Sequence, residues 1–91
     1  MLVIIKSAPD TQEARRAVKL ARDMAADIVL LQDAVYLSRP ERLEGFCGTA
    51  YALSEDLGLR GVEDLEAGVK AIDYGELVDL MDGEDKVIGL F

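Results

Sequence analysis

The chain has 91 residues, of which 51% are hydrophobic, and its formal net charge is −8 because 18 acidic residues face 10 basic ones. This length fits a single domain over residues 1–91, and the hydrophobic content suffices for a packed core, which excludes general disorder. The whole imbalance lies in residues 46–91, which carry eleven acidic and three basic residues. An acidic chain without a Lys/Arg cluster is poorly suited to nucleic-acid phosphates, so we expect no direct nucleic-acid binding.

Cysteine content and hydropathy indicate the compartment. Cys47 is the single cysteine, so no disulfide forms within the chain, as is usual in a reducing compartment. The opening apolar run is too short for a signal peptide, and no stretch is long enough to span a membrane. We therefore expect a cytoplasmic protein with no membrane association.

Short β-branched runs divide the chain into strands that alternate with helical segments. Continuous apolar runs of this kind are typical of strands buried on both faces of a parallel sheet. They predict strands over Leu2–Ile5, Ile28–Leu31, Thr49–Leu53, Val69–Ile72 and Lys86–Leu90. The alternation predicts an α/β protein with a mostly parallel sheet of about five strands between two layers of helices.

The segments between the strands carry helix signals. Pro9-Asp10-Thr11 ends the first strand and offers a cap for an amphipathic helix with its basic residues on one side. Ser54 resembles the N-cap of a second helix, which has Leu57 and Leu59 as apolar anchors.

Two further helical segments are predicted. Asp33 can cap a short helical turn after the second strand, and an exposed loop follows over residues 38–48. Asp73 or Tyr74 opens a last helix, whose predicted apolar face consists of Leu77, Leu80 and Met81.

Familiar catalytic signatures are absent from the sequence. The chain has no histidine, which removes His-based triads and His metal sites, and one cysteine cannot form a thiolate metal cage. No Gly-rich phosphate loop follows the first strand. The acidic pairs at residues 55–56 and 84–85 are adjacent in sequence and point in different directions, so we expect neither a metal nor a cofactor.

Polar residues follow the carboxyl ends of the predicted strands. In open α/β sheets, ligands and partners bind at that edge. Each of these residues alone is explained as a cap or turn residue, and their common edge is what makes a site plausible. The candidates are Gln32, Asp33, Glu55, Asp56, Arg60, Asp73 and Tyr74, together with Ser7 and Ser54.

Three blocks in the same order resemble the DsrH/TusB family of sulfur-relay subunits. Residues 30–35, LLQDAV, resemble the family's LLQDGV block, with Ala34 in place of glycine. Residues 50–57, AYALSEDL, with Arg60-Gly61 resemble its VYAL-EDL-ARG block, and residues 72–80, IDYGELVDL, are similar to its IDY-FV-L block.

This resemblance implies a flavodoxin-like, three-layer fold of the DsrE/F/H superfamily and association with DsrE/TusD-like and DsrF/TusC-like paralogues. Such complexes relay persulfide sulfur toward thiolation of the wobble uridine in certain tRNAs, or in sulfur oxidation. The DsrE/TusD-like subunit carries the essential cysteine, whereas the DsrH/TusB-like subunit is mainly architectural. We therefore interpret the seven candidates from Gln32 to Tyr74 as partner-binding residues and expect no catalytic residue. Self-association is a further expectation, because the core of so short a chain is marginal.

Two alternatives remain open at this stage. A stand-alone homo-oligomer would carry sulfur on Cys47, although that residue precedes the third strand, at the edge of the sheet opposite the polar residues. A lone cysteine is usually a small core residue, and a carrier needs an accessible thiolate of lowered pKa. A small-ligand binding module would instead use a cleft at the strand ends.

Overall fold

The computed structural model of the chain describes residues 1–38, 48–62 and 69–89. These residues form a sheet with helices on both faces, which confirms the predicted α/β class. In chain order the elements are β1 (Leu2–Ile5), α1 (Gln12–Asp23), β2 (Asp27–Leu30), the 3-10 helix η1 (Gln32–Ser38), β3 (Ala50–Leu53), α2 (Ser54–Leu59), β4 (Val69–Ile72), α3 (Tyr74–Gly83) and β5 (Val87–Ile88).

The sheet has five strands in the order β4-β3-β2-β1-β5, and every strand pair is parallel. The strands β1 to β4 lie side by side in sequence order, and α3 then returns the chain so that β5 pairs with β1. Flavodoxin itself has the order 2-1-3-4-5, so the layered architecture is what the two share. Because all strands are parallel, the segments that leave β2, β3 and β4 start from one edge of the sheet.

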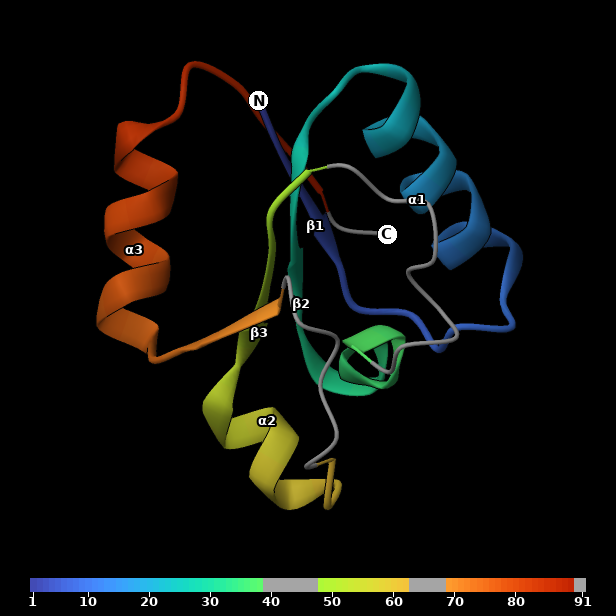
Figure 1. Cartoon of the computed structure of the whole chain (residues 1–91), viewed down its shortest axis with the longest axis vertical. Coiled ribbons are helices and arrows are strands. Elements are labelled where there is room, and N and C mark those ends of the chain that lie inside the picture. The colour runs from blue at the N-terminus through green and yellow to red at the C-terminus, as the bar shows by residue number, and fades with distance from the viewer. Residues whose placement is uncertain (39–47, 63–68, 90–91) are drawn as a thin grey trace.

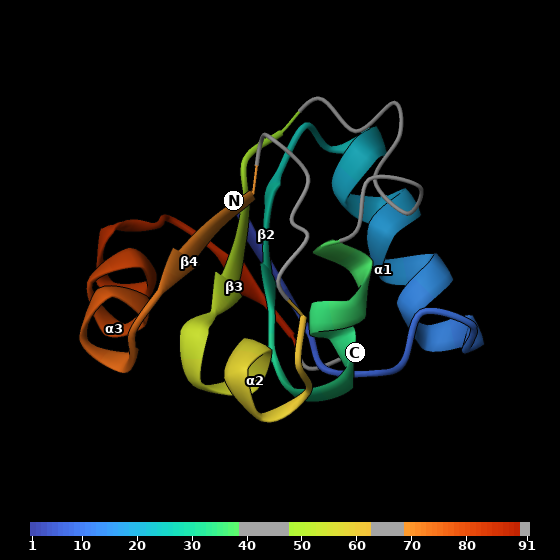
Figure 2. The ribbon, with the colours of Figure 1, turned by 60° about the horizontal axis from the view of Figure 1, so that its bottom comes forward.

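The two faces of the sheet are covered unequally. Figures 1 and 2 show α1 and η1 on one side of the sheet and α3 on the other. The larger core joins alternate strand residues such as Val3 and Ile5 to the apolar sides of α1, η1 and α2. The smaller core joins Leu2 and Ile4 to Leu77 of α3. Strand β1 is buried on both faces, as its continuous apolar run predicts.

Helix α1 follows the pattern predicted for it. The Thr11 hydroxyl accepts a hydrogen bond from the backbone N–H of Ala14 and donates one to the carbonyl oxygen of Ala8. The first bond satisfies an otherwise unpaired N–H of the first turn, so Thr11 fixes where the helix begins. The residues that α1 buries against the sheet are small, namely Ala14, Ala17, Val18 and Ala21.

Several local predictions are wrong. Leu53, and not Ser54, is the N-cap of α2, since helical geometry already starts at Ser54. Leu59 is 75% exposed, because it lies two positions, about 200° around the helix, from buried Leu57. Met81 is 40% exposed, because the part of the apolar face of α3 that lies against the sheet is the part around Leu77. The last strand is shorter than predicted and spans Val87–Ile88.

Candidate functional site

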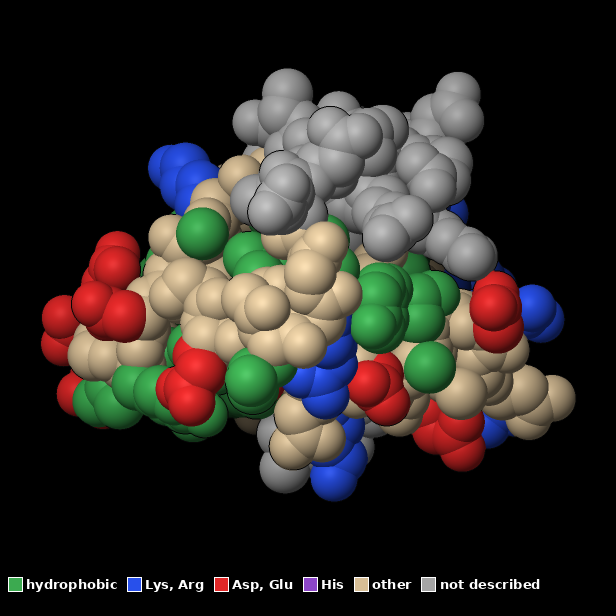
Figure 3. Space-filling view, turned by 90° about the horizontal axis from the view of Figure 1, so that it is seen from below, with side chains coloured by type: hydrophobic (Ala, Val, Ile, Leu, Met, Phe, Trp, Pro, Cys, Tyr) green, Lys and Arg blue, Asp and Glu red, His purple; other side chains and the backbone are tan. Residues whose placement is uncertain are grey.

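The carboxyl ends of β2 and β3 bring two short helices together at one edge of the sheet. The 3-10 helix η1 starts with Gln32 and Asp33 directly after β2, and α2 follows β3 and supplies Asp56 and Arg60. Figure 3 looks onto this edge and shows basic side chains near its middle with acidic side chains close by. We refer to Gln32, Asp33, Asp56 and Arg60 as the edge cluster.

Asp56 is the buried centre of the edge cluster. Its residue is 9% exposed, and it is the single buried charged residue among those described. Its Oδ2 accepts a hydrogen bond of 2.8 Å from the backbone N–H of Gln32. Gln32 has a φ of +52°, a left-handed conformation that residues other than glycine rarely adopt. The carboxylate of Asp56 therefore stabilises an unfavourable backbone conformation at the end of β2.

Arg60 connects the two helices from the other end of α2. Its Nε donates a hydrogen bond of 3.0 Å to Oδ1 of Asp33, and its Nη1 lies 3.5 Å from Oδ1 of Asp56. The Arg60 side chain is 23% exposed and that of Asp33 is 59% exposed, whereas that of Asp56 is 13% exposed. One guanidinium thus bridges a surface carboxylate of η1 and a shielded carboxylate of α2. The bridge holds η1 against α2 and leaves one side of Asp33 open to solvent.

Ala34 clarifies the departure from the family's glycine. It is fully buried, and the left-handed conformation lies two residues earlier, at Gln32. The turn therefore does not require glycine at position 34. Its burial in the larger core favours a small side chain there.

The remaining candidates lie elsewhere. Asp73 is the N-cap of α3 and forms a capping box with Glu76, in which each side chain accepts a hydrogen bond from the other residue's backbone N–H, at 2.7 and 3.2 Å. Tyr74 is 58% exposed at the first position of that helix. Both follow β4, two strands away from β2 in the sheet. Glu55 is exposed in the first turn of α2.

A hollow of about 410 Å³ lies beside α3, outside the edge cluster. Tyr51 and Ile72 of the sheet and Glu76, Asp79 and Leu80 of α3 line it, together with Gly83 and Glu84. The N-terminal ammonium group lies 3.1 Å from Oε2 of Glu84, which ties the start of β1 to the segment after α3. This ion pair was not predicted, because nothing in the sequence relates residues 83 positions apart.

Chemically, the edge cluster combines the charged side chains of Asp33, Asp56 and Arg60 with the backbone N–H of Gln32, and it contains no thiol. Cys47, the only thiol of the chain, lies outside the described residues. Over residues 1–38, 48–62 and 69–89, no group of three or more Cys, His, Asp or Glu could hold a metal ion. None of the helices described there has the length and apolar character needed to cross a bilayer. The arrangement is suited to binding, since a partly exposed guanidinium and an exposed carboxylate are held at fixed positions.

A family model described as "DsrH like protein" matches residues 6–87, which is most of the chain. The chain belongs to the DsrH-like family. Membership implies a role in sulfur relay, and two of the three sequence blocks that resemble this family supply the whole edge cluster. No curated protein was found to match.

The fold also has a solved counterpart. The crystal structure of the ychN protein from E. coli is similar with a TM-score of 0.81, over 98% of this chain and 97% of that chain. The two sequences are 20% identical, so the likeness concerns the fold alone.

Proposed function

We propose that the chain is a non-catalytic subunit of a sulfurtransferase relay complex, serving thiolation of the tRNA wobble uridine or sulfur oxidation. In this role it binds DsrE/TusD-like and DsrF/TusC-like paralogues, and one of these supplies the carrier cysteine. Family membership supports the sulfur-relay part of the proposal. The partner surface is argued below from the edge cluster.

The observation that carries the proposal is the bridge from Arg60 to Asp33 and Asp56. A buried carboxylate and a left-handed Gln32 are each unfavourable on their own, and strained or desolvated groups of this kind cluster at functional sites. Interfaces favour arginine because its planar fork binds carboxylates and its stem packs on apolar surface. The edge cluster therefore has the composition of a prearranged protein-binding surface.

The architectural role competes with one other interpretation of the sequence. A sulfur carrier needs a thiolate, and Cys47 is the only cysteine. The alternative is a stand-alone carrier that uses Cys47. Persulfide-tagging mass spectrometry after incubation with a sulfur donor distinguishes the two, because stoichiometric labelling of Cys47 would support the carrier.

Substitution of Arg60 tests the partner surface. The two ion pairs of Arg60 are partly exposed, so Arg60→Ala should lower the melting temperature by only a few degrees. Association with the paralogous subunits should weaken by about 1–3 kcal/mol, as measured in a pull-down titration. The matched control is Lys70→Ala, which removes an exposed cation on β4 and should change neither quantity.

The two measurements together decide the outcome. If the melting temperature collapses while the folded fraction binds its partners normally, Arg60 serves the fold alone and the proposed surface is wrong. Unchanged stability and unchanged association would make Arg60 a solvated charge, which also contradicts the proposal.

A further inference from the structure

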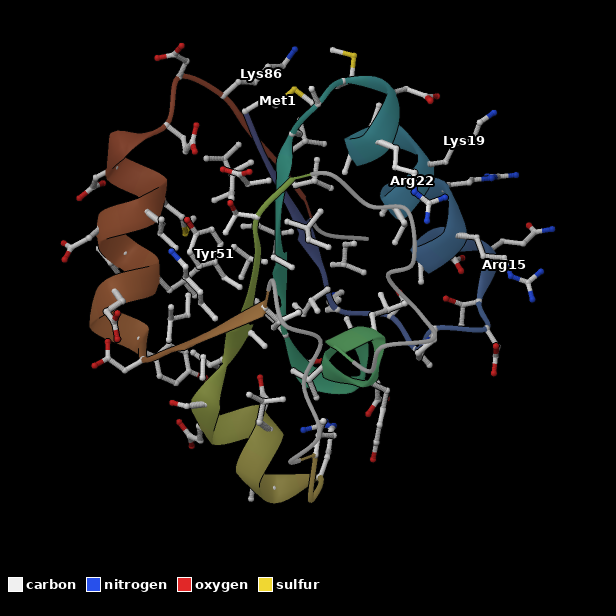
Figure 4. All side chains as sticks on the ribbon, in the orientation of Figure 1. Met1, Arg15, Lys19, Arg22, Tyr51 and Lys86 are labelled. Carbon is white, nitrogen blue, oxygen red and sulfur yellow. The ribbon has the colours of Figure 1, made fainter. Side chains whose placement is uncertain are left out.

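The two helical layers carry opposite charges. Helix α1 has Arg15, Arg16, Lys19 and Arg22 exposed, against Glu13 and Asp23. Helix α3 has exposed Glu76, Asp79 and Asp82 and no basic residue, and Glu84, Asp85 and the exposed Lys86 follow it. The two helices lie on opposite sides of the sheet, and Figure 4 shows Arg15, Lys19 and Arg22 on the side of α1. Among the described residues, the helix on one side of the sheet is therefore predominantly basic and the helix on the other side is acidic.

The charges of both faces are available to a partner. In the part of the chain that the structure describes, Arg15, Arg16 and Lys19 form no ion pair, and neither do Asp79 and Asp82. Along α1 the basic residues Arg15, Lys19 and Arg22 are four and three residues apart, and along α3 successive acidic residues are three apart, which is about 4.5–6 Å along a helix axis. The spacing of positive charges on α1 thus matches that of negative charges on α3.

An apolar stripe accompanies the acidic residues of α3. Tyr74, Val78 and Met81 are 58, 55 and 40% exposed, and their spacing places them on one side of the helix. Asp82 lies next to this stripe around the helix. Long basic side chains cover apolar surface with their methylene stems while their charged ends remain at the rim. Helix α1 presents such side chains.

We infer that α3 of one molecule binds α1 of a second copy of this chain. Charge complementarity selects this occupant, because one chain supplies both a basic helix and an acidic, partly apolar helix. The two surfaces differ, so the contact is heterologous. Every pair of molecules therefore retains one free α1 and one free α3. Such pairs extend until a ring closes or a longer assembly forms. This inference concerns the chain alone and does not depend on the proposed function.

Charge exchange tests the inference. One variant carries Arg15→Glu and Lys19→Glu, and the other carries Asp79→Lys and Asp82→Lys. The unmodified chain should have a mass above 9.9 kDa by light scattering at micromolar concentration, whereas each variant alone should be a monomer. An equimolar mixture should associate again, because the reversed α1 of one variant complements the reversed α3 of the other, and the two unmodified helices complement each other as before. Lys6→Glu, a reversal of an exposed charge outside both helices, should associate as the unmodified chain does.

Three results would overturn the inference: a monomeric unmodified chain, variants that associate alone, or a mixture of folded variants that stays monomeric. Circular dichroism verifies that each variant is folded. If a reversed variant fails to fold, Lys19→Gln and Asp79→Asn replace the reversals, and each should reduce association at least several-fold. No relay subunit is present in these measurements, so their outcome is independent of that of the pull-down titration.

Discussion

Asp56→Ala is expected to destabilise the fold far more than its position in the first turn of a six-residue helix suggests. The substitution removes the acceptor of the 2.8 Å hydrogen bond from the Gln32 N–H. A hydrogen bond to a charged group contributes about 1.5–3 kcal/mol, and the longer contact with Arg60 adds at most about 1 kcal/mol. We therefore expect a loss of about 2–3 kcal/mol in the free energy of unfolding.

Thermal and urea unfolding monitored by circular dichroism measure this loss. For a chain of this size, the expected loss corresponds to a decrease in melting temperature of about 8–20 °C. Protein concentration must be equal in all samples, since self-association would shift the transition. Asp56→Asn keeps one acceptor oxygen and should fall between wild type and alanine.

Glu55→Ala is the matched control. Glu55 and Asp56 both lie in the first turn of α2 and interact similarly with its helix dipole, but Glu55 is exposed. The difference between the two alanine variants therefore isolates the contacts with Gln32 and Arg60. If the two variants lose equal stability, the role assigned to Asp56 is refuted.

Three further substitutions have defined expectations. Leu77→Ala should cost about 2–4 kcal/mol in urea unfolding, since Leu77 is 7% exposed and anchors α3; a loss below 1 kcal/mol would refute that role. Asp73→Ala should cost about 1 kcal/mol by removing the capping box with Glu76, and Asp73→Ser should restore most of it; equal losses for both variants would contradict the cap. Cys47→Ser should leave the rate of sulfur transfer by the reconstituted complex nearly unchanged, whereas loss of transfer would support the carrier alternative.

The strands were predictable because burial on both faces leaves a local signature. The run Leu2–Ile5 needs no tertiary information to be recognised, and β1 has these bounds. Thr11 likewise marks the start of α1 through a contact only three residues away. The predicted length of β5 was too large, because the length of this strand depends on where its pairing with β1 ends.

The candidate site was predictable only as a set of residues at one edge. The sequence places Gln32, Asp33, Asp56 and Arg60 after their strands, but the left-handed conformation of Gln32 depends on a contact across 24 positions. The separation of Asp73 from this cluster depends on the strand order. Similarly, the charge imbalance between the halves of the sequence does not reveal that basic and acidic helices occupy opposite faces.

The unequal cover of the sheet has a consequence for how the molecule opens. Helix α3 has one buried anchor, Leu77, and β5 pairs with the sheet through two residues. Proteins open in parts whose free energies reflect how much apolar surface each part buries. The segment from Asp73 to Ile88 should therefore detach at lower cost than α1, which buries four residues against the sheet. Its amides should exchange with solvent before those of α1, so the acidic helix is also the more adaptable of the two.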